Sequence, residues 1–249
     1  MIVITMLFKI LLICLLPFLN SCEEKKNDIK QTLIMGTSAD YKPFAFIQDN
    51  EIVGFEVDLA KALAKELNIN LEIKDMDFAA LIPALNSTRI DFVMASMTPS
   101  SERLKHIDFS NPYYTGFVTI LTRKDNSISD LDGITQGTLG VQMGSVWETF
   151  ANKKAFENPD IKVFVGNKIP QLIEELKVGR IDILILEEEQ AREIVLFNPE
   201  FTYIILNKSE DSIAVAFTKG SNLVPEFNKA LETLERTGEL SRLRAKWLN

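Results

Sequence analysis

The 249-residue sequence predicts an α/β fold with two similar lobes. Apolar runs of strand type alternate with segments whose apolar residues recur at helical spacing, which is typical of parallel sheets flanked by helices. The order Ile-Pro-X-Leu at 82–85 and Arg-Ile-Asp at 89–91 recurs at 169–172 and 180–182. Each lobe therefore has a helix–strand unit of one kind, unless the different spacing of proline and aspartate, 8 positions against 12, reflects chance or convergence.

The first half of the chain begins this alternation near residue 33. Strands are predicted at 33–36, 52–55, 71–73 and 91–95. Apolar residues at helical spacing from Val57 to Leu67 predict a helix after the second strand, and a shorter helix is predicted over 79–86. Two of the strands thus follow a helix, as in a parallel sheet.

The second half repeats the alternation. Strands are predicted at 139–142, 162–165 and 181–186, with helices between them at about 146–155 and 171–178. Near the C-terminus, apolar residues from Phe227 to Leu234 line one helical face, which Gly238 ends, and those from Leu240 to Trp247 line another. With 46% hydrophobic residues, the chain can build a core for both lobes.

Polar residues follow a buried strand in each lobe. Ser96 and Thr98 come after the strand at 91–95, and Glu187 comes after the strand at 181–186. In open parallel sheets, ligands bind beyond the carboxyl ends of the strands. A cleft between the lobes would then present hydroxyls and backbone amides on one wall and a carboxylate on the other.

The composition excludes two classes of function. With 27 Lys and Arg against 35 Asp and Glu, the formal net charge is −8, so the chain offers no basic surface for a nucleic acid. One histidine, His106, and two cysteines, Cys14 and Cys22, are too few for a Cys/His zinc site. We expect no metal, no cofactor and no nucleic-acid partner.

Residues 1–21 are typical of a lipoprotein signal peptide. Lys9 precedes a core of about ten apolar residues, and small Ser21 lies beside Cys22, whose thiol would be acylated before cleavage. We therefore expect a lipid on Cys22, a polar tether over 22–32, and an exported protein anchored at the periplasmic or cell-surface side of a membrane. The alternative is a transmembrane anchor, in which Lys9 would cost about 2.5–3.5 kcal/mol.

Five short motifs occur in order along the first half of the chain. They are Gly-Thr-Ser-Ala-Asp-Tyr-Lys-Pro-Phe at 36–44, Val-Gly-Phe-Glu-Val-Asp-Leu-Ala at 53–60, Asp-Phe at 77–78, Ser-Met-Thr at 96–98 with Glu-Arg at 102–103, and Asp-Phe-Ser-Asn-Pro-Tyr-Tyr at 108–114. Each alone is weak, but the series resembles the bacterial extracellular solute-binding proteins of family 3, which are amino-acid receptors of ABC importers. The resemblance covers about 33–247.

This resemblance implies the type II two-lobe fold of periplasmic binding proteins, with two hinge strands and the ligand in a cleft between the lobes. We place lobe one at 33–115 and 213–249 and lobe two at 116–212, with the crossings near 115–118 and 212–217. The resemblance also implies a binding protein rather than an enzyme, a free amino acid as ligand and an ABC importer permease as partner. We expect a monomer.

The resemblance further implies a set of ligand-binding residues in lobe one. Arg103 matches the arginine that grips the ligand α-carboxylate, a role that suits a planar guanidinium fork. Thr98 and Ser96 match positions that add hydroxyl or backbone contacts to the carboxylate and the ammonium. The alternative for Arg103 is a surface salt bridge to Asp108 or Glu102.

In lobe two, the resemblance assigns a closing loop and an acid. Gln142 and the backbone amide of Val146 match the loop that closes on the carboxylate, and Gly144 with Ser145 predicts a tight turn there. Glu187 stands where the family usually has the aspartate that pairs with the α-ammonium. Because Glu187 opens a run of three glutamates, a solvated face is the alternative.

The side-chain pocket is predicted to favour arginine. Tyr41 and Phe78 match aromatics that sandwich the ligand side chain, and two rings hold a flat cation by stacking and cation–π attraction. Ser38 replaces an aspartate that the family often has, which serves a lysine-like charge less well. Glutamine, lysine and histidine stay open, and Asp40 either answers a guanidinium or points outward.

Two other functions are compatible with parts of this sequence. An enzyme of the same fold, of the cyclohexadienyl or arogenate dehydratase type, could use cleft carboxylates for acid–base chemistry. No nucleophile–base pair is evident, however, and His106 stands alone. A sensor input module would need a transmembrane helix and an output domain, which we do not expect. The favoured reading is a lipid-anchored receptor that delivers a polar or cationic amino acid to an ABC importer by hinge closure.

Overall fold

The computed structural model describes residues 30–126, 133–208 and 212–248. By its contacts the chain divides into Met1–Lys30 and Gln31–Asn249, and the fold is that of the second unit. The predicted signal peptide, Cys22 and most of the predicted tether lie outside the described residues. Within the described part, no helix has the length and apolar character needed to cross a membrane.

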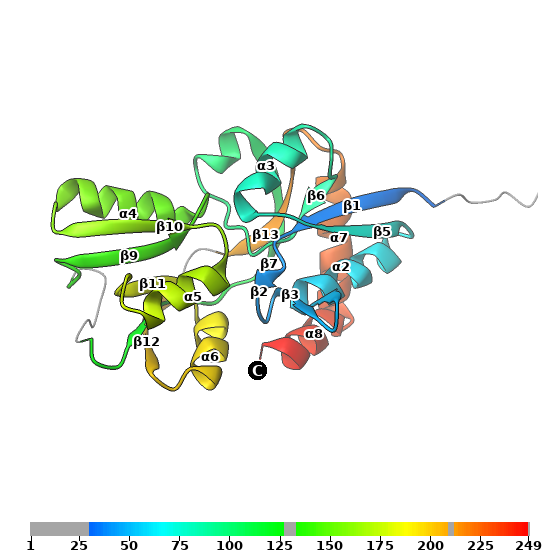
Figure 1. The fold of residues 1–249 in the computed structure, drawn as a ribbon. Coiled ribbons are helices and arrows are strands. Elements are labelled where there is room, and N and C mark those ends of the chain that lie inside the picture. The colour runs from blue at the N-terminus through cyan, green and yellow to red at the C-terminus, as the bar shows by residue number, and fades with distance from the viewer. Residues whose placement is uncertain (1–29, 127–132, 209–211, 249) are drawn as a thin grey trace, which may run out of the picture. The chain divides into compact units, whose positions relative to one another are not determined.

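The first sheet combines strands from both ends of the Gln31–Asn249 unit (Figure 1). Its strands are β1 (Thr32–Thr37), β5 (Asn70–Asp75), β6 (Phe92–Val93), β7 (Ile107–Tyr114) and β13 (Ile213–Thr218). They lie in the order β5-β1-β6-β13-β7, and β5, β1 and β6 are parallel whereas β13 is antiparallel to its neighbours. The β6 strand is shorter than the predicted 91–95 run.

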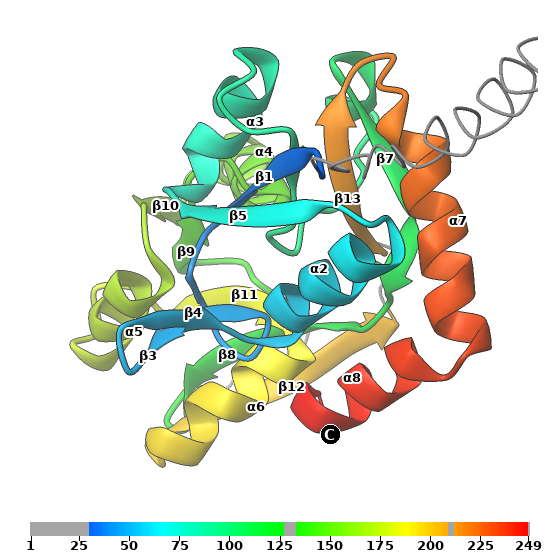
Figure 2. The same cartoon turned by 90° about the vertical axis from the view of Figure 1, so that its right-hand side faces the viewer.

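Helices cover both faces of this sheet (Figure 2). The helices are α2 (Phe55–Glu66), α3 (Phe78–Asn86), α7 (Leu223–Arg236) and α8 (Glu239–Trp247). The apolar stripes of α2, α7 and α8 join one core, which contains Phe55 and Phe227. The α3 helix joins a second core with Leu81 and Ile90 on the other face. This sheet and its helices are lobe one.

The second sheet has the same build. Its strands are β8 (Phe117–Arg123), β9 (Gly137–Gln142), β10 (Ile161–Gly166), β11 (Ile183–Glu187) and β12 (Phe201–Lys208), in the order β10-β9-β11-β8-β12. The α4 helix (Val146–Glu157) packs on one face, and α5 (Ile169–Lys177) and α6 (Glu188–Phe197) pack on the other. This sheet and its helices are lobe two. The predicted two-lobe α/β fold is confirmed.

A small sheet and a single turn complete lobe one. The small sheet contains β2 (Asp40–Tyr41), β3 (Ala45–Gln48) and β4 (Glu51–Val53), and η1 (Arg103–Lys105) is a turn of 3₁₀-helix. The predicted strand over 52–55 extends two residues beyond the end of β4. Gly54, with φ 132°, ends the strand, and α2 starts directly afterwards. A Cβ at Gly54 would lie 2.3 Å from the carbonyl oxygen of Phe44, so only glycine fits this corner.

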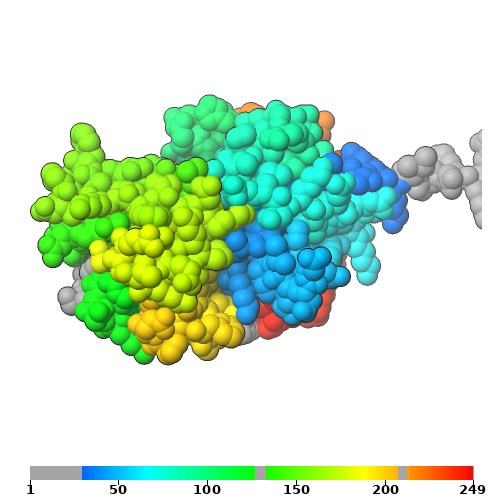
Figure 3. All heavy atoms as spheres, viewed as in Figure 1, coloured from blue at the N-terminus to red at the C-terminus, as the bar shows by residue number. Residues whose placement is uncertain are grey.

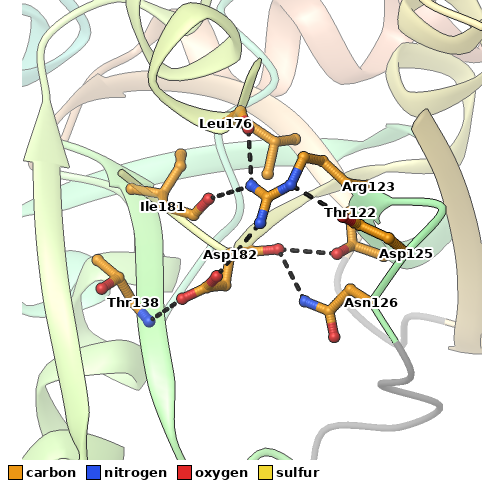
Figure 4. A network of polar contacts seen from close by, with 8 residues as sticks. All are labelled: Thr122, Arg123, Asp125, Asn126, Thr138, Leu176, Ile181 and Asp182. Carbon is orange, nitrogen blue, oxygen red and sulfur yellow. Dashed lines mark hydrogen bonds and ion pairs between the residues drawn. The ribbon is translucent and has the colours of Figure 1, made fainter. Parts of the chain in front are cut away.

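The sequence echo is a structural repeat. In lobe one, Asp91 donates its backbone N–H to the carbonyl oxygen of Ile34 at 2.8 Å, and its carboxylate accepts the Ile34 N–H at 2.7 Å. In lobe two, Asp182 makes the same two contacts with Thr138, at 2.9 and 2.8 Å. Figure 4 shows the second of them, between the Asp182 carboxylate and the Thr138 N–H. Each aspartate thus ties the start of a buried strand to the neighbouring strand, which argues against chance as the origin of the echo.

Arg123 adds a further link in lobe two (Figure 4). One of its terminal nitrogens donates to the carbonyl oxygens of Leu176 and Ile181, at 2.8 and 3.0 Å, and the other lies 3.5 Å from the Asp182 carboxylate. These contacts join β8 to the end of α5 and the segment before β11. The network is therefore structural, and it lies in lobe two alone.

The chain passes between the lobes after β7 and again after β12. Thr115 follows β7, and Ser212 precedes β13. Their side-chain oxygens lie 2.7 Å apart, so a hydrogen bond joins the two crossings. This hydrogen bond holds the two connections side by side. A hinge between the lobes would bend at these two connections.

Candidate ligand-binding site

A cavity lies where the carboxyl ends of both sheets face each other. Its empty volume is about 530 Å³, open mouth included, which suits a small molecule. All nine residues that were predicted to bind a ligand line it: Ser38, Tyr41, Phe78, Ser96, Thr98, Arg103, Gln142, Val146 and Glu187. Further lining residues were not in the predicted set: Asp40, Ala95, Ser145, Trp147, Ile169, Ile185 and Leu186.

The Arg103 guanidinium is fixed by backbone of both lobes. Its side chain donates to the carbonyl oxygens of Thr98, at 2.8 Å, and Gly144, at 3.0 Å. Its guanidinium carbon lies 5.5 Å from the centre of the Phe78 ring, a cation–π distance. Arg103 is only 9% exposed, and this burial lowers its pKa to about 10, so it is charged at neutral pH.

No carboxylate within the described ranges neutralises Arg103. The predicted alternative, a salt bridge to Asp108 or Glu102, is wrong, because Asp108 pairs with Lys219 at 2.6 Å and Glu102 pairs with Lys105. Backbone carbonyls satisfy only part of a guanidinium, which has five N–H donors. The remaining donors can receive a carboxylate from a molecule in the cavity.

The lobe-one wall around Arg103 is polar and largely buried. Thr98 is buried, and Ser38 is buried with its hydroxyl donating to Asp40 at 2.7 Å. Ser96 is half-buried and has a left-handed backbone, with φ 49°. These groups follow β6 and β1, so the strand ends position them as the parallel-sheet argument predicted.

Aromatic rings bound the cavity from both lobes. Tyr41 is half-buried, and its ring lies 5.9 Å from that of Phe44. Phe78, the first residue of α3, is 9% exposed. Trp147 in α4 adds a ring that sequence reasoning missed, since the resemblance gave no role to this position.

The start of α4 forms the lobe-two wall. Gly144 has φ 77°, and the predicted tight turn is present, with the Ser145 N–H donating to the Gln142 carbonyl oxygen at 3.1 Å. The Ser145 hydroxyl caps the helix by accepting the Glu148 N–H at 3.1 Å. The N–H of Val146 lies in the first turn of the helix, where such groups have no intrahelical acceptor and attract anions.

Asp40 points inward and bridges the lobes. Its carboxylate accepts the N–H of Ile169, at the start of α5, at 3.0 Å, and the Gln142 amide lies at 3.4 Å. The sequence left open whether the Asp40 side chain points into the cavity or outward. Figure 3 shows the surface where atoms of α5 (yellow-green) border those of the small sheet (blue).

Glu187 ends β11 and faces the cavity. The alternative of a solvated glutamate run is wrong, because Glu187 and Glu188 are half-buried and Glu189 is buried. The run changes direction at the start of α6, so its side chains do not share one face. A carboxylate of lobe two thus lines the same cavity as Arg103.

The comparison with known families decides what kind of protein has this site. The model of the bacterial extracellular solute-binding proteins, family 3, matches residues 33–249. The chain belongs to this family. As a family-3 solute-binding protein it is a binding protein rather than an enzyme, and it is exported, as extracellular family members are.

Similar family-3 proteins bind amino acids. The arginine-binding extracellular protein ArtP of Bacillus subtilis (strain 168) is 42% identical over 221 residues, which are 88% of this chain and 86% of ArtP. An ancestral arginine-binding protein bound to arginine has a TM-score of 0.84 at 36% identity and covers 88% of this chain and 99% of its own. The structure of an ancestral arginine-binding protein bound to glutamine has a TM-score of 0.82 at 37% identity, with 88% and 98% covered.

Proposed function

We propose that this family-3 protein is a lipid-anchored receptor that binds a free amino acid, with arginine favoured, and delivers it to an ABC importer permease. The observation that carries the proposal is the buried guanidinium of Arg103, which faces the cavity without a carboxylate partner in the described part of the chain. A buried charge is stable only when it is paired. The α-carboxylate of an amino acid supplies that pair.

The ends of the cavity suit the two charges of an amino acid backbone. Arg103, Thr98 and the N–H of Val146 are proposed to hold the carboxylate, because they supply N–H or O–H donors around one point. Glu187 and Ser96 are proposed to hold the ammonium, because a carboxylate and hydroxyl or carbonyl oxygens accept its protons. A zwitterion is thus favoured over a simple acid or amine.

The remaining wall is proposed to take the ligand side chain. Tyr41 and Phe78 offer ring faces, and the Asp40 carboxylate, next to Ser38, offers a negative partner for a guanidinium. The rings and the carboxylate thus favour arginine, and the arginine-binding relatives support this choice. The closing of the Gln142 loop on the ligand carboxylate stays part of the proposal. Glutamine, lysine and histidine are the other outcomes of the test.

Closure of the lobes follows from where the contacts lie. Arg103 belongs to lobe one and bonds Gly144 of lobe two, and Asp40 of lobe one bonds Ile169 of lobe two. A ligand that touches both walls adds contacts that exist only when the lobes meet, so it stabilises the closed form. We propose that the permease distinguishes this form from the open one.

Three further parts of the proposal concern the whole protein. We propose that it is a monomer, that 33–115 with 213–249 and 116–212 act as the two moving bodies, and that Cys22 carries a lipid after removal of 1–21. The lipid is tested in cells by Cys22→Ser. Loss of acyl labelling and of the membrane-bound fraction supports the anchor, and normal processing with unchanged membrane fractionation contradicts it.

Thermal unfolding against the twenty amino acids tests the binding function. A ligand present at 100 times its dissociation constant stabilises the folded state by about 2.7 kcal/mol. We expect arginine to give the largest increase in melting temperature. If none of the twenty raises the melting temperature, the amino-acid receptor is the wrong function for this chain.

A further inference from the structure

Three of the sequence motifs converge on one buried oxygen. Glu56, from the motif at 53–60, lies in the first turn of α2 and is 0% exposed. Its Oε1 accepts the backbone N–H of Ser96 at 2.6 Å, the Ser96 hydroxyl at 3.1 Å, and the hydroxyl of Tyr113. Ser96 is 40 residues away in sequence and Tyr113 is 57 away. Burial raises the pKa of Glu56, which these bonds oppose.

Ser96 needs such an anchor. Its φ of 49° lies in the left-handed region, which is unfavourable for a residue other than glycine, asparagine or aspartate. Ser96 also lines the ligand cavity, and Thr98, two residues on, bonds Arg103 through its carbonyl oxygen. The direction of this whole segment therefore depends on the conformation at Ser96.

We propose that Glu56 is a positioning residue for the ligand site: its carboxylate locks Ser96 in the left-handed conformation and thereby aims the segment from Ser96 to Thr98 at the ligand. Glu56 does not itself line the cavity. It acts through Ser96, and the hydroxyl of Tyr113 on β7 donates to the same carboxylate oxygen. This inference rests on the proposed amino-acid function, which the measurements below test separately.

A rescue experiment with glycine distinguishes positioning from simple core packing. Glu56→Leu fills the same space with an apolar side chain but removes the acceptor, and we expect it to weaken arginine binding about tenfold or more by calorimetry. Glycine adopts φ near +50° without an anchor. Ser96→Gly alone is the baseline, because it removes the hydroxyl proposed to contact the ammonium. In the Ser96→Gly background, Glu56→Leu should therefore cost at least about threefold less affinity than it costs in the wild type. The control is Glu66→Leu, an exposed glutamate on the same helix, with unchanged affinity.

Two results would overturn the positioning role of Glu56. If Glu56→Leu binds arginine within twofold of wild type, or if it costs as much affinity in the Ser96→Gly background as in the wild type, Glu56 does not position the site. If Glu56→Leu does not fold, Glu56→Asp is used, because it keeps the carboxyl group and withdraws it by one methylene. We then expect faster amide hydrogen exchange at Ser96 together with weaker arginine binding, and faster exchange at unchanged affinity overturns the inference. A wild type that binds none of the twenty amino acids refutes the proposed function instead.

Discussion

The Arg103 guanidinium of lobe one donates a hydrogen bond of 3.0 Å to the carbonyl oxygen of Gly144, 41 residues away in lobe two. A second bond, of 2.8 Å, goes to Thr98 in its own lobe. The cation is thus held at the line where the lobes meet, by two neutral acceptors. A carboxylate that arrives there neutralises the charge and reinforces the contact between the lobes.

Arg103→Ala should abolish binding of every α-amino acid rather than change the preference among them, because all of them share the carboxylate. The loss of a buried charge-assisted pair is on the order of 2–5 kcal/mol. Calorimetric titration with arginine, glutamine and histidine measures the effect. Arg89→Ala, at an exposed arginine of the same lobe, is the control. Near-wild-type affinity in Arg103→Ala would place the carboxylate elsewhere.

Phe78→Ala should weaken arginine binding by roughly 1–3 kcal/mol, since the site loses a cation–π partner and apolar contact area. Phe78 also packs in the core of lobe one and against Arg103, so the variant should melt at a lower temperature. The affinity is therefore measured well below that melting temperature. An arginine affinity equal to that of wild type in the folded variant would exclude Phe78 from the side-chain pocket.

Glu187→Gln should weaken all amino acids to a similar extent, because the α-ammonium is common to them. The change keeps the size of the side chain and removes its charge, so we expect a loss of about 1.5–3 kcal/mol, typical of a hydrogen bond to a charged group. Titrations with arginine and glutamine give the comparison. If both affinities stay unchanged, another acceptor holds the ammonium.

Asp58→Asn should remove a pH-dependent part of the stability. Burial raises the pKa of Asp58, but hydrogen bonds from Lys246, at 2.6 Å, and Trp247, at 2.9 Å, outweigh it, and the pKa is lowered overall. A lowered carboxyl pKa stabilises the fold above the unfolded value of about 3.9, and this contribution disappears as the pH falls through the folded pKa.

The expected cost of Asp58→Asn is about 0.5–1 kcal/mol at pH 7, because partial exposure screens the pair. Denaturant unfolding at pH 7 and at acid pH measures the gap between wild type and variant, which should shrink on acidification. A gap that stays constant would mean that packing, and not the charge of Asp58, joins α8 to α2.

The sequence predicted those elements whose apolar pattern is strong. The strands β1, β9 and β10 and the helices α2, α5 and α7 lie where periodicity placed them, within a few residues. The α6 helix was missed, since it opens with glutamates and begins directly after a strand without a turn residue. The strand β6 is short because the Asp91 carboxylate takes the N–H of Ile34 beside it, a contact that no local pattern signals.

The candidate site followed from motifs rather than from periodicity. A motif pointed to Arg103 and the end of a predicted strand pointed to Glu187, and both residues line one cavity. The roles of Asp40 and Glu56 could not be predicted, because both depend on partners far away in sequence, at Ile169 and Ser96. Tertiary contacts decide the direction of such side chains, and the sequence alone contains no signal for it.

The central claim is that Arg103 binds the ligand carboxylate. Calorimetric titration tests it most directly, with the wild-type protein titrated with arginine and with the arginine analogue that carries hydrogen in place of the carboxylate. Both molecules have the same guanidinium and chain, so only the group assigned to Arg103 differs. We predict that arginine binds and that the analogue binds at least about 30-fold more weakly, as the loss of a buried charge pair requires. Equal affinity for the two molecules would contradict the assignment of Arg103 to the ligand carboxylate.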